Sequence, residues 1–381
     1  MVLVGSMDSQ PHMVRRRKAS LAGTNLELTG DYNQRLVYQA IRVRGPITRN
    51  ALIELTGLAK PTIAGIVRRL LGSELVLETS RIFGGRGQPA VHLELNPEGC
   101  YSVGLQGDDE RLDLVSIDAL GNPVSRAVIT KPSSSGERAK THFRTQYLKL
   151  TERIRRDRII GLGVAMSGLV SKDGQHTDQG DGDIGIDLLA LSDLSPGVPI
   201  YIDSALAAAT AGESLFGVGA SLQSYYYILM GPNPVGGLVA QDGLFKGAHP
   251  GTKRILFPGA ERAWCRQAIA ADRMAGPAPC EEAWLEAACA NLIPLLTSIN
   301  CMLNPGGVLL GGPFPDGWLT LLAERCNALL LDSAPEIPSH AGIQPARLAR
   351  DATLIGAASL PMRARLFPIG EALLKAHDHA G

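Results

Sequence analysis

The chain has 381 residues, 45% of them hydrophobic, and its 37 lysines and arginines balance 37 aspartates and glutamates. The length suggests two or three domains, and the hydrophobic content suffices for a large core. No apolar run approaches the ~20 residues of a membrane span, and the basic run 15–18 is not followed by the apolar stretch of a secretory leader. Six scattered cysteines without a Cys-x-x-Cys pair are typical of reduced thiols. We therefore expect a cytoplasmic protein.

Basic residues are concentrated toward the N-terminal end. Up to Glu98 there are 13 basic and 8 acidic residues, which leaves 24 basic and 29 acidic residues for the rest. This asymmetry is typical of a chain that contacts nucleic acid with one end. Residues 1–30 are polar and lack a clear periodicity. We expect a flexible basic arm there, whose run 15–18 adds phosphate contacts, although an ordinary solvated tail explains the same residues equally well.

Residues 31–97 have the pattern of a winged helix-turn-helix. Apolar residues at helical spacing predict a first helix over Asn33–Arg44, with Arg35, Gln39 and Arg42 facing solvent. Gly45-Pro46 ends that helix.

Two further helices are expected around a tight turn at Gly57. The first covers Arg49–Thr56 and can be capped by Thr48. Its apolar side consists of Leu52, Ile53 and Leu55. The second runs from Lys60 to about Leu71, with a proline in its first turn. Its buried stripe is predicted to consist of Ile63, Ile66, Val67 and Leu70.

The outer face of this third helix is small and basic, which suits a major groove. Strands at Leu75–Leu77 and Val91–Leu95, joined by a glycine-rich loop, predict a wing whose Arg86 reaches a minor groove. We therefore expect a double-stranded DNA operator to be contacted by Thr48, Arg49, Lys60, Thr62, Arg68, Arg69, Arg81, Arg86 and Gln88. The alternative is a small helical subdomain that packs on a partner, with its arginines solvated.

Residues 98–367 alternate strands and helices, which predicts two α/β lobes with a cleft between them, followed by a tail over 368–381. The expected elements are an antiparallel meander of Tyr101–Gln106, Leu112–Ile117 and Val124–Thr130, a helix over Glu137–Arg155, strands at Ile159–Ala165 and Val198–Ile202, a helix over Ala205–Phe216, a hairpin of Tyr225–Met230 and Gly237–Gln241, a helix over Glu281–Leu303, a strand at Gly307–Gly311 and a helix over Trp318–Leu331.

Four motifs, taken in this order, resemble the ROK family (repressors, open reading frames and sugar kinases). They are Gly161–Gly168, Ala208–Gly217, Asp242–His249 and Leu309–Gly312. The resemblance covers roughly residues 33–366. It implies a transcriptional regulator in which a winged helix-turn-helix precedes a two-lobed, actin-like (ribonuclease H-like) sugar-kinase fold.

We also expect a homodimer or higher homo-oligomer, because helix-turn-helix proteins read paired half-sites. The apolar helix Ala283–Leu303 is the expected contact between subunits. A buried core helix explains its composition equally well.

The residues that would phosphorylate a sugar are altered. In ROK kinases an Asn-Asp pair follows the strand that ends here at Ile202, and its Asp is the general base. Counting back from the Gly-Glu pair at 212–213, these two positions fall on Ser204 and Ala205, and a methyl group accepts no proton. Asp203 lies two positions from the base position and could substitute only if the backbone shifted.

Both phosphate loops of the family are altered as well. Gln106–Glu110 replaces an Asp-Leu-Gly-Gly-Thr type of turn and would place three carboxylates beside a polyphosphate. In the second loop, Gly231–Gly237, Pro232 and Pro234 each remove an N–H donor, and Val235 adds bulk. These changes together argue against ATP binding.

The zinc site that the resemblance implies is also broken. Its Glu and His positions fall on Arg254 and Phe257, and residues 258–264 contain no cysteine, so that only Cys265 remains. The Glu after that cysteine, another sugar contact in the family, is Gln267. We expect no metal and no cofactor.

These departures favour a repressor of genes for carbohydrate or related metabolism, with a catalytically inactive domain that senses a sugar-like effector. The residues expected to line the effector cleft are Ser167, Asp203, Ser204, His249, Arg254 and Gln267. Two alternatives remain open: an active ROK-type sugar kinase with an N-terminal DNA-binding extension, and a regulator whose second domain only dimerises.

Overall fold

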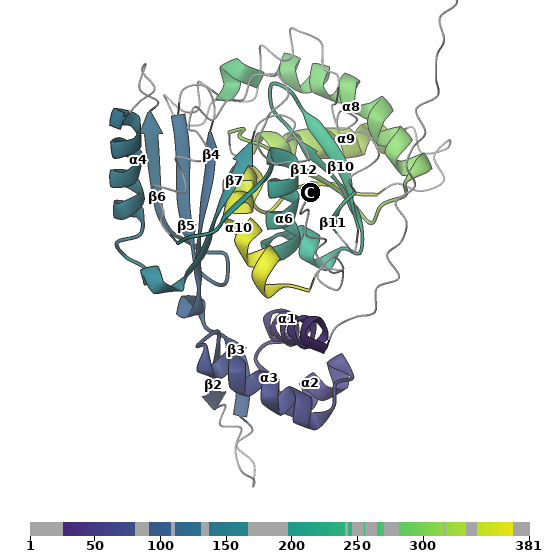
Figure 1. Cartoon of the computed structure of the whole chain (residues 1–381). Helices are drawn as coiled ribbons and strands as arrows, with labels where there is room; N and C mark the ends of the chain where they lie inside the picture. Colours follow the sequence, from purple (N-terminus) through teal and green to yellow (C-terminus); the bar gives the residue numbers. More distant parts are fainter. Residues whose placement is uncertain are drawn as a thin grey trace, which may run out of the picture.

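The computed structural model describes residues 26–80, 91–107, 111–130, 137–166, 197–240, 243–245, 255, 265–269, 282–315, 317–332 and 341–368. Three sheets organise them. A three-stranded sheet lies in the N-terminal part, and two five-stranded sheets lie in the larger body above it (Figure 1).

The N-terminal part consists of three helices and a small antiparallel sheet of order β1-β3-β2. Its elements are α1 (Leu26–Arg44), β1 (Ile47–Thr48), α2 (Arg49–Thr56), α3 (Lys60–Gly72), β2 (Val76–Ser80) and β3 (Val91–Leu95). The predicted helices and both wing strands are confirmed. Two features differ from the expectation: α1 begins at Leu26, inside the stretch assigned to a flexible arm, and β1 adds a third strand.

The buried stripes of these helices converge on one core. Ile63, Ile66, Val67 and Leu70 of α3 are all buried, as the spacing predicts. Leu52 of α2 is fully buried, but Leu55 is 51% exposed, so its assignment to the core was wrong. Residues three apart lie about 60° from each other around a helix, so Leu55 falls at the edge of the buried face, beside a hollow in the surface.

The first large sheet has the order β6-β5-β4-β7-β8. The predicted antiparallel meander is confirmed as β4 (Tyr101–Gly107), β5 (Arg111–Ile117) and β6 (Pro123–Thr130), and β7 (Ile159–Met166) and β8 (Ile200–Ser204) continue the sheet in parallel. The polar helix α4 (Glu137–Leu150) packs on its outer face through Phe143 and Tyr147, and it ends before the predicted Arg155.

The second large sheet has the order β11-β10-β9-β12-β13. Its strands are β9 (Tyr225–Leu229), β10 (Val235–Ala240), β11 (Gly243–Leu244), β12 (Val308–Gly311) and β13 (Ile343–Pro345). Helices α8 (Glu282–Met302) and α9 (Trp318–Asp332) cover it through a cluster that contains Trp284, Phe314 and Trp318. By length and composition α8 could cross a membrane, but its apolar stripe is buried in this cluster.

Two helices lie between the large sheets: α6 (Ala205–Phe216), which was predicted, and α10 (Ala352–Leu366), which was not. Glycines let them approach closely. A Cβ on Gly356 of α10 would lie 2.1 Å from the Ala208 carbonyl oxygen of α6, and one on Gly163 of β7 would lie 1.8 Å from that of Ala357. The two lobes are therefore joined by a tightly packed helix pair.

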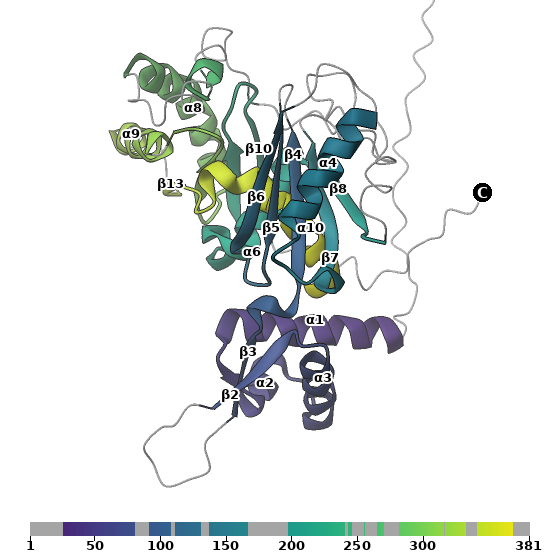
Figure 2. The same cartoon turned by 90° about the vertical axis from the view of Figure 1, so that its left-hand side faces the viewer.

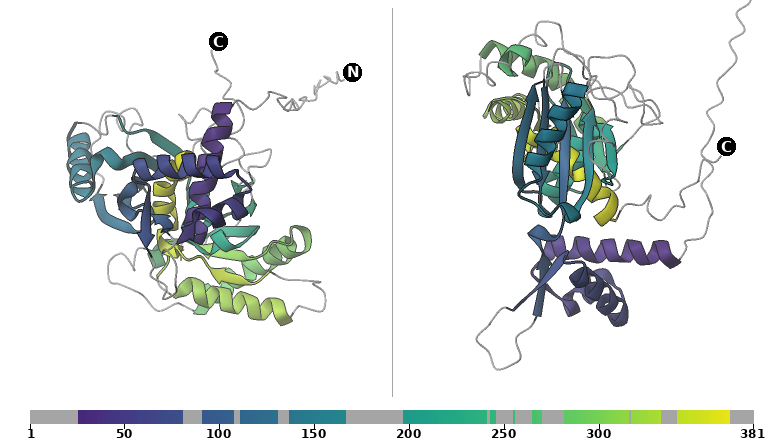
Figure 3. Two further views of the ribbon diagram at one scale, coloured as in Figure 1. Left: turned by 90° about the horizontal axis from the view of Figure 1, so that it is seen from below. Right: turned by 60° about the vertical axis from the view of Figure 1, so that its left-hand side comes forward.

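Helix α1 lies against the base of the larger body, with α2 and α3 on its far side (Figures 2 and 3). Arg35 donates to the Ala364 carbonyl at 2.7 Å, and Arg42 donates to the Leu215 carbonyl. The buried Tyr38 ring meets Phe367 edge-on at a centroid distance of 5.7 Å. The prediction that Arg35 and Arg42 face solvent was wrong, because this side of α1 is a contact surface between the two parts.

Replacing Gly163 by alanine is expected to destabilise the fold by about 1–3 kcal/mol, because the new methyl group meets the α10 backbone and neither element can move freely. Urea unfolding followed by circular dichroism measures the change. As a control, Gly30→Ala in α1 meets nothing within 4 Å, and it should raise stability by up to about 1 kcal/mol. Equal effects of the two variants would contradict the packing described here.

Candidate nucleic-acid interface

The turn between α2 and α3 is fixed by local hydrogen bonds. The Thr48 side chain accepts a hydrogen bond from the Ala51 N–H at 3.2 Å, so it caps α2 as predicted. Gly57 ends that helix with φ at 68°, and its N–H donates to the Ile53 carbonyl at 2.9 Å. This left-handed conformation favours glycine. The angle at which α3 leaves the turn is therefore set by these residues.

Helix α3 presents a basic face to solvent. Opposite its buried stripe, the side chains of Lys60, Thr62, Arg68 and Arg69 are exposed, and small residues lie between them. Small residues allow close approach to a groove, while the cations attract phosphate. Helix α3 itself lies on the far side of α1 from the larger body (Figure 2).

The predicted contact residues differ in their partners. Arg49 forms an ion pair with Glu78 of β2 at 2.5 Å, and Arg69 donates to the Gln34 side chain of α1 at 2.9 Å. Among the described residues, neither Lys60 nor Arg68 forms an ion pair. Lys60 and Arg68 therefore carry the cations of this face that are most available to a phosphate. Arg81, Arg86 and Gln88 lie outside the described residues.

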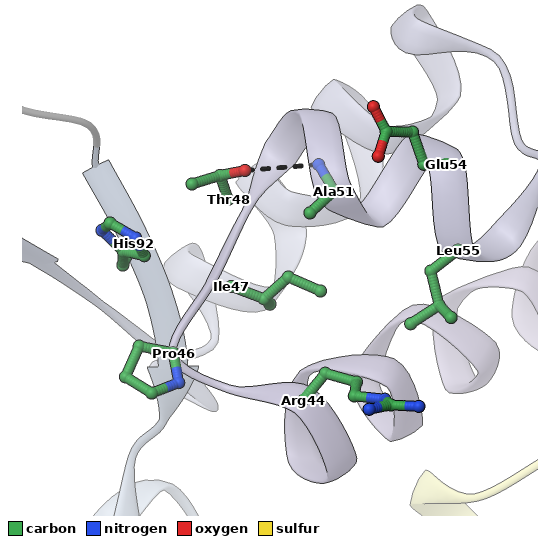
Figure 4. A pocket seen from close by; sticks show the side chains of 8 residues that line it. All are labelled: Arg44, Pro46, Ile47, Thr48, Ala51, Glu54, Leu55 and His92. Carbon is green, nitrogen blue, oxygen red and sulfur yellow. Dashed lines mark hydrogen bonds between the residues drawn. The ribbon is translucent and has the colours of Figure 1, made fainter.

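A hollow of about 570 Å³ lies beside α2, bounded by the end of α1, β1 and β3 (Figure 4). Leu55 lines it, which explains why that side chain is exposed. Arg44 also lines it and is exposed, yet sequence analysis did not include this residue among the DNA contacts. Its position as the last residue of α1, next to the strand that leads to Thr48, was the available signal.

The effector residues predicted from sequence are only partly described. Asp203 and Ser204 end β8 at the head of α6, where Ser204 Oγ accepts from the Ala207 N–H at 3.2 Å and Asp203 Oδ1 accepts from the Ser204 N–H at 2.8 Å. Gln267 is exposed. Ser167, His249 and Arg254 lie outside the described residues.

Sequence analysis missed the structural importance of Glu213. Its side chain is fully buried in α6, and it accepts hydrogen bonds from the backbone N–H groups of Val218, Arg347 and Leu348 at 2.7, 2.9 and 3.2 Å. A buried carboxylate is stable only when its oxygens have such donors. The available signal was a single glutamate within the otherwise small and apolar motif Ala208–Gly217, because glutamate is rarely buried unless its oxygens are paired.

No protein-family model matches the chain. The xylose repressor of Bacillus subtilis is 26% identical over 227 residues, which cover 56% of this chain and 57% of the repressor. The chain thus matches little more than half the length of this curated relative.

Two solved structures share the fold. A ROK family transcriptional regulator, described as a homologue of the Escherichia coli Mlc protein, superposes with a TM-score of 0.64 at 18% identity, covering 92% of this chain and all of that one. A ROK hexokinase from Thermus thermophilus gives 0.51 at 18% identity, covering 69% and 99%.

The comparisons confirm the resemblance to the ROK family. The superposition with the regulator covers 92% of this chain, so the unmatched part is shorter than the stretch from residue 26 to residue 95. The shared fold therefore includes part of the helix-turn-helix. The predicted fold class, a winged helix-turn-helix followed by two actin-like lobes, is confirmed as well.

Loss of the Thr48 hydroxyl should weaken α2. Thr48→Ala removes the acceptor of the Ala51 N–H and is expected to cost about 0.5–2 kcal/mol of unfolding free energy, whereas Thr48→Ser keeps it and should cost less. Urea titration of the three proteins gives the comparison. If the serine variant loses as much as the alanine variant, the hydroxyl is not the group that stabilises the helix.

Proposed function

We propose that this chain is a DNA-binding transcriptional regulator that represses genes of carbohydrate or related metabolism. Residues 31–97 form the DNA-binding unit, and residues 98–367 form an effector and dimerisation unit. The observation that carries the proposal is the exposed basic face of α3, opposite a fully buried stripe, on a helix that lies on the far side of α1 from the body. The relative named xylose repressor supports it, as does the coverage of the regulator structure.

We further propose that the larger domain is not a kinase, although a ROK hexokinase shares its fold. Ala205, at the position of the family's general base, is the first residue of α6, and the carboxylate of Asp203 accepts the Ser204 N–H. The loop from β9 to β10 carries Pro232 and Pro234, and the Pro234 carbonyl accepts from the Ile255 N–H at 2.9 Å. Neither proline supplies an N–H donor to a phosphate.

The residues present do not fit the family's zinc site. Cys265 is fully buried in the apolar cluster of α8 and α9, and a single buried thiol cannot hold tetrahedral zinc. Among the described residues there is no group of three or more His, Cys, Asp or Glu side chains able to hold a metal. Phe257 and residues 258–264 lie outside the described ranges, so the expectation of no zinc stays a prediction.

Three further parts of the proposal follow from the same assignment. The head of α6, with Asp203 and Ser204, contributes to the site of a sugar-like effector. The protein is a homodimer or higher homo-oligomer that reads paired half-sites.

The protein is located in the cytoplasm, where its operator DNA is found. The surface of α8 and α9, where Met302 and Leu331 are exposed, is the proposed dimer contact.

Removing the charge of the α3 face should weaken DNA binding. Arg68→Ala/Arg69→Ala takes away two phosphate contacts, so affinity for the promoter region should fall for all sequences and the slope of log K against log salt should decrease by about 2. Fluorescence anisotropy at several salt concentrations measures both quantities. The matched control, Arg144→Ala/Arg153→Ala, removes two exposed charges from the α4 side and should bind as the wild type does.

Kinase assays test the second part of the proposal. A coupled assay with ATP and common hexoses and pentoses should give background turnover, because removal of a general base typically costs ~10²–10⁴ in rate. ATP-dependent turnover that Asp203→Asn abolishes would show that Asp203 serves as the base, and the regulator would then also be an enzyme.

A further inference from the structure

A second cavity, separate from the head of α6, lies where the two domains meet. It has a volume of about 310 Å³ and is lined by residues of α1, α6, α10 and β11, with Phe367 at its edge. Ser214 of α6 lines it, and Asp203 precedes the opposite end of that helix. Ser214 lies nine positions after Ala205, which at a rise of 1.5 Å per residue corresponds to about 14 Å along the helix. The two sites are therefore distinct.

The cavity contains a half-buried cation that pairs with no carboxylate of the described residues. Arg42 of α1 lines it half-buried, with its guanidinium 5.3 Å from the centre of the Phe367 ring. Its Nε donates to Gln39 Oε1 at 3.0 Å and one amino group donates to the Leu215 carbonyl, which uses two of its five N–H donors. No carboxylate of the described residues pairs with it. Burial lowers the pKa of Arg42, as expected for a cation with little compensation.

The rest of the wall suits an organic anion. Arg363 of α10 adds a second guanidinium, and the part of the lining that the structure describes contains no aspartate or glutamate. The Ser214 and Tyr225 hydroxyls, 2.7 Å apart, form a polar patch beside apolar side chains. Guanidinium groups bind phosphate and carboxylate strongly, and 310 Å³ is within the range of small-ligand pockets.

We propose that this cavity binds a small, hydroxyl-bearing organic anion, whose phosphate or carboxylate group pairs with Arg42. Because α1 supplies Arg42 and the larger domain supplies Ser214 and Arg363, the bound anion contacts both domains at once and stabilises their docked arrangement by mass action. The proposal concerns ligand binding alone and does not depend on DNA binding.

Isothermal titration calorimetry of the full chain tests it with four probes: glucose 6-phosphate, glucuronate, glucose and inorganic phosphate. We expect glucose 6-phosphate or glucuronate to bind and glucose not to bind. Tighter binding of glucose 6-phosphate identifies a phosphate site, and tighter binding of glucuronate identifies a carboxylate site. Arg42→Gln should weaken binding at least about tenfold, the effect of losing a charge-assisted hydrogen bond.

Two further variants keep the test decisive. Arg35→Gln removes the other arginine by which α1 contacts the larger domain, but Arg35 does not line the cavity, so this variant should bind as the wild type does. Ala220→Trp fills the cavity from an exposed position on its rim and should abolish binding even if Arg42→Gln fails to fold. Absence of anion binding at 10 mM probe, or unchanged binding by folded Arg42→Gln or Ala220→Trp, would overturn the proposal.

Discussion

The packing of α1 against the end of α10 is the contact on which the arrangement of this molecule depends. Tyr38 and Phe367 meet in a core that continues from the helix-turn-helix into β5 and α10, with Cys100 and Val115 among its buried members. Burial raises the pKa of the Cys100 thiol to about 12, so this group stays neutral inside the core. Since one apolar cluster includes residues of both parts, the N-terminal part is held against the larger body by a hydrophobic contact.

Above that contact, α6 and α10 connect the two lobes. Glycines at 163, 212 and 356 remove the side chains that would keep the helices and the sheet apart, and the backbones come into van der Waals contact. Helix α10 also carries the residues that meet α1, namely Ala364 and, just after its end, Phe367. The same helix therefore contacts both the core of the larger body and α1.

Local rules sufficed for the helix-turn-helix because its boundaries depend on neighbouring residues. Thr48, Gly57 and the stripe from Ile63 to Leu70 each act within a few positions along the chain, and all were predicted. The surroundings of Arg35 and Arg42 were not predictable in this way, since their carbonyl partners lie 329 and 173 residues away. Helix α10 escaped prediction because it is buried on nearly every side, and so it has no amphipathic pattern. At the proposed effector site, the sequence indicated Asp203 and Ser204, but the hydrogen bond that Ser204 Oγ accepts from the Ala207 N–H of α6 was identified only from the structure.

The buried carboxylate of Glu213 has a consequence for how this fold can vary. It joins α6 to two other segments, one at Val218 and one at Arg347 and Leu348. These hydrogen bonds come from backbone N–H groups, so none of them depends on the side chains of the three donor residues. Any residue other than proline supplies that donor. A single glutamate thus fixes this junction while the side chains of its partners are free to vary. Homologous chains could therefore have different surfaces here and keep the same backbone hydrogen bonds.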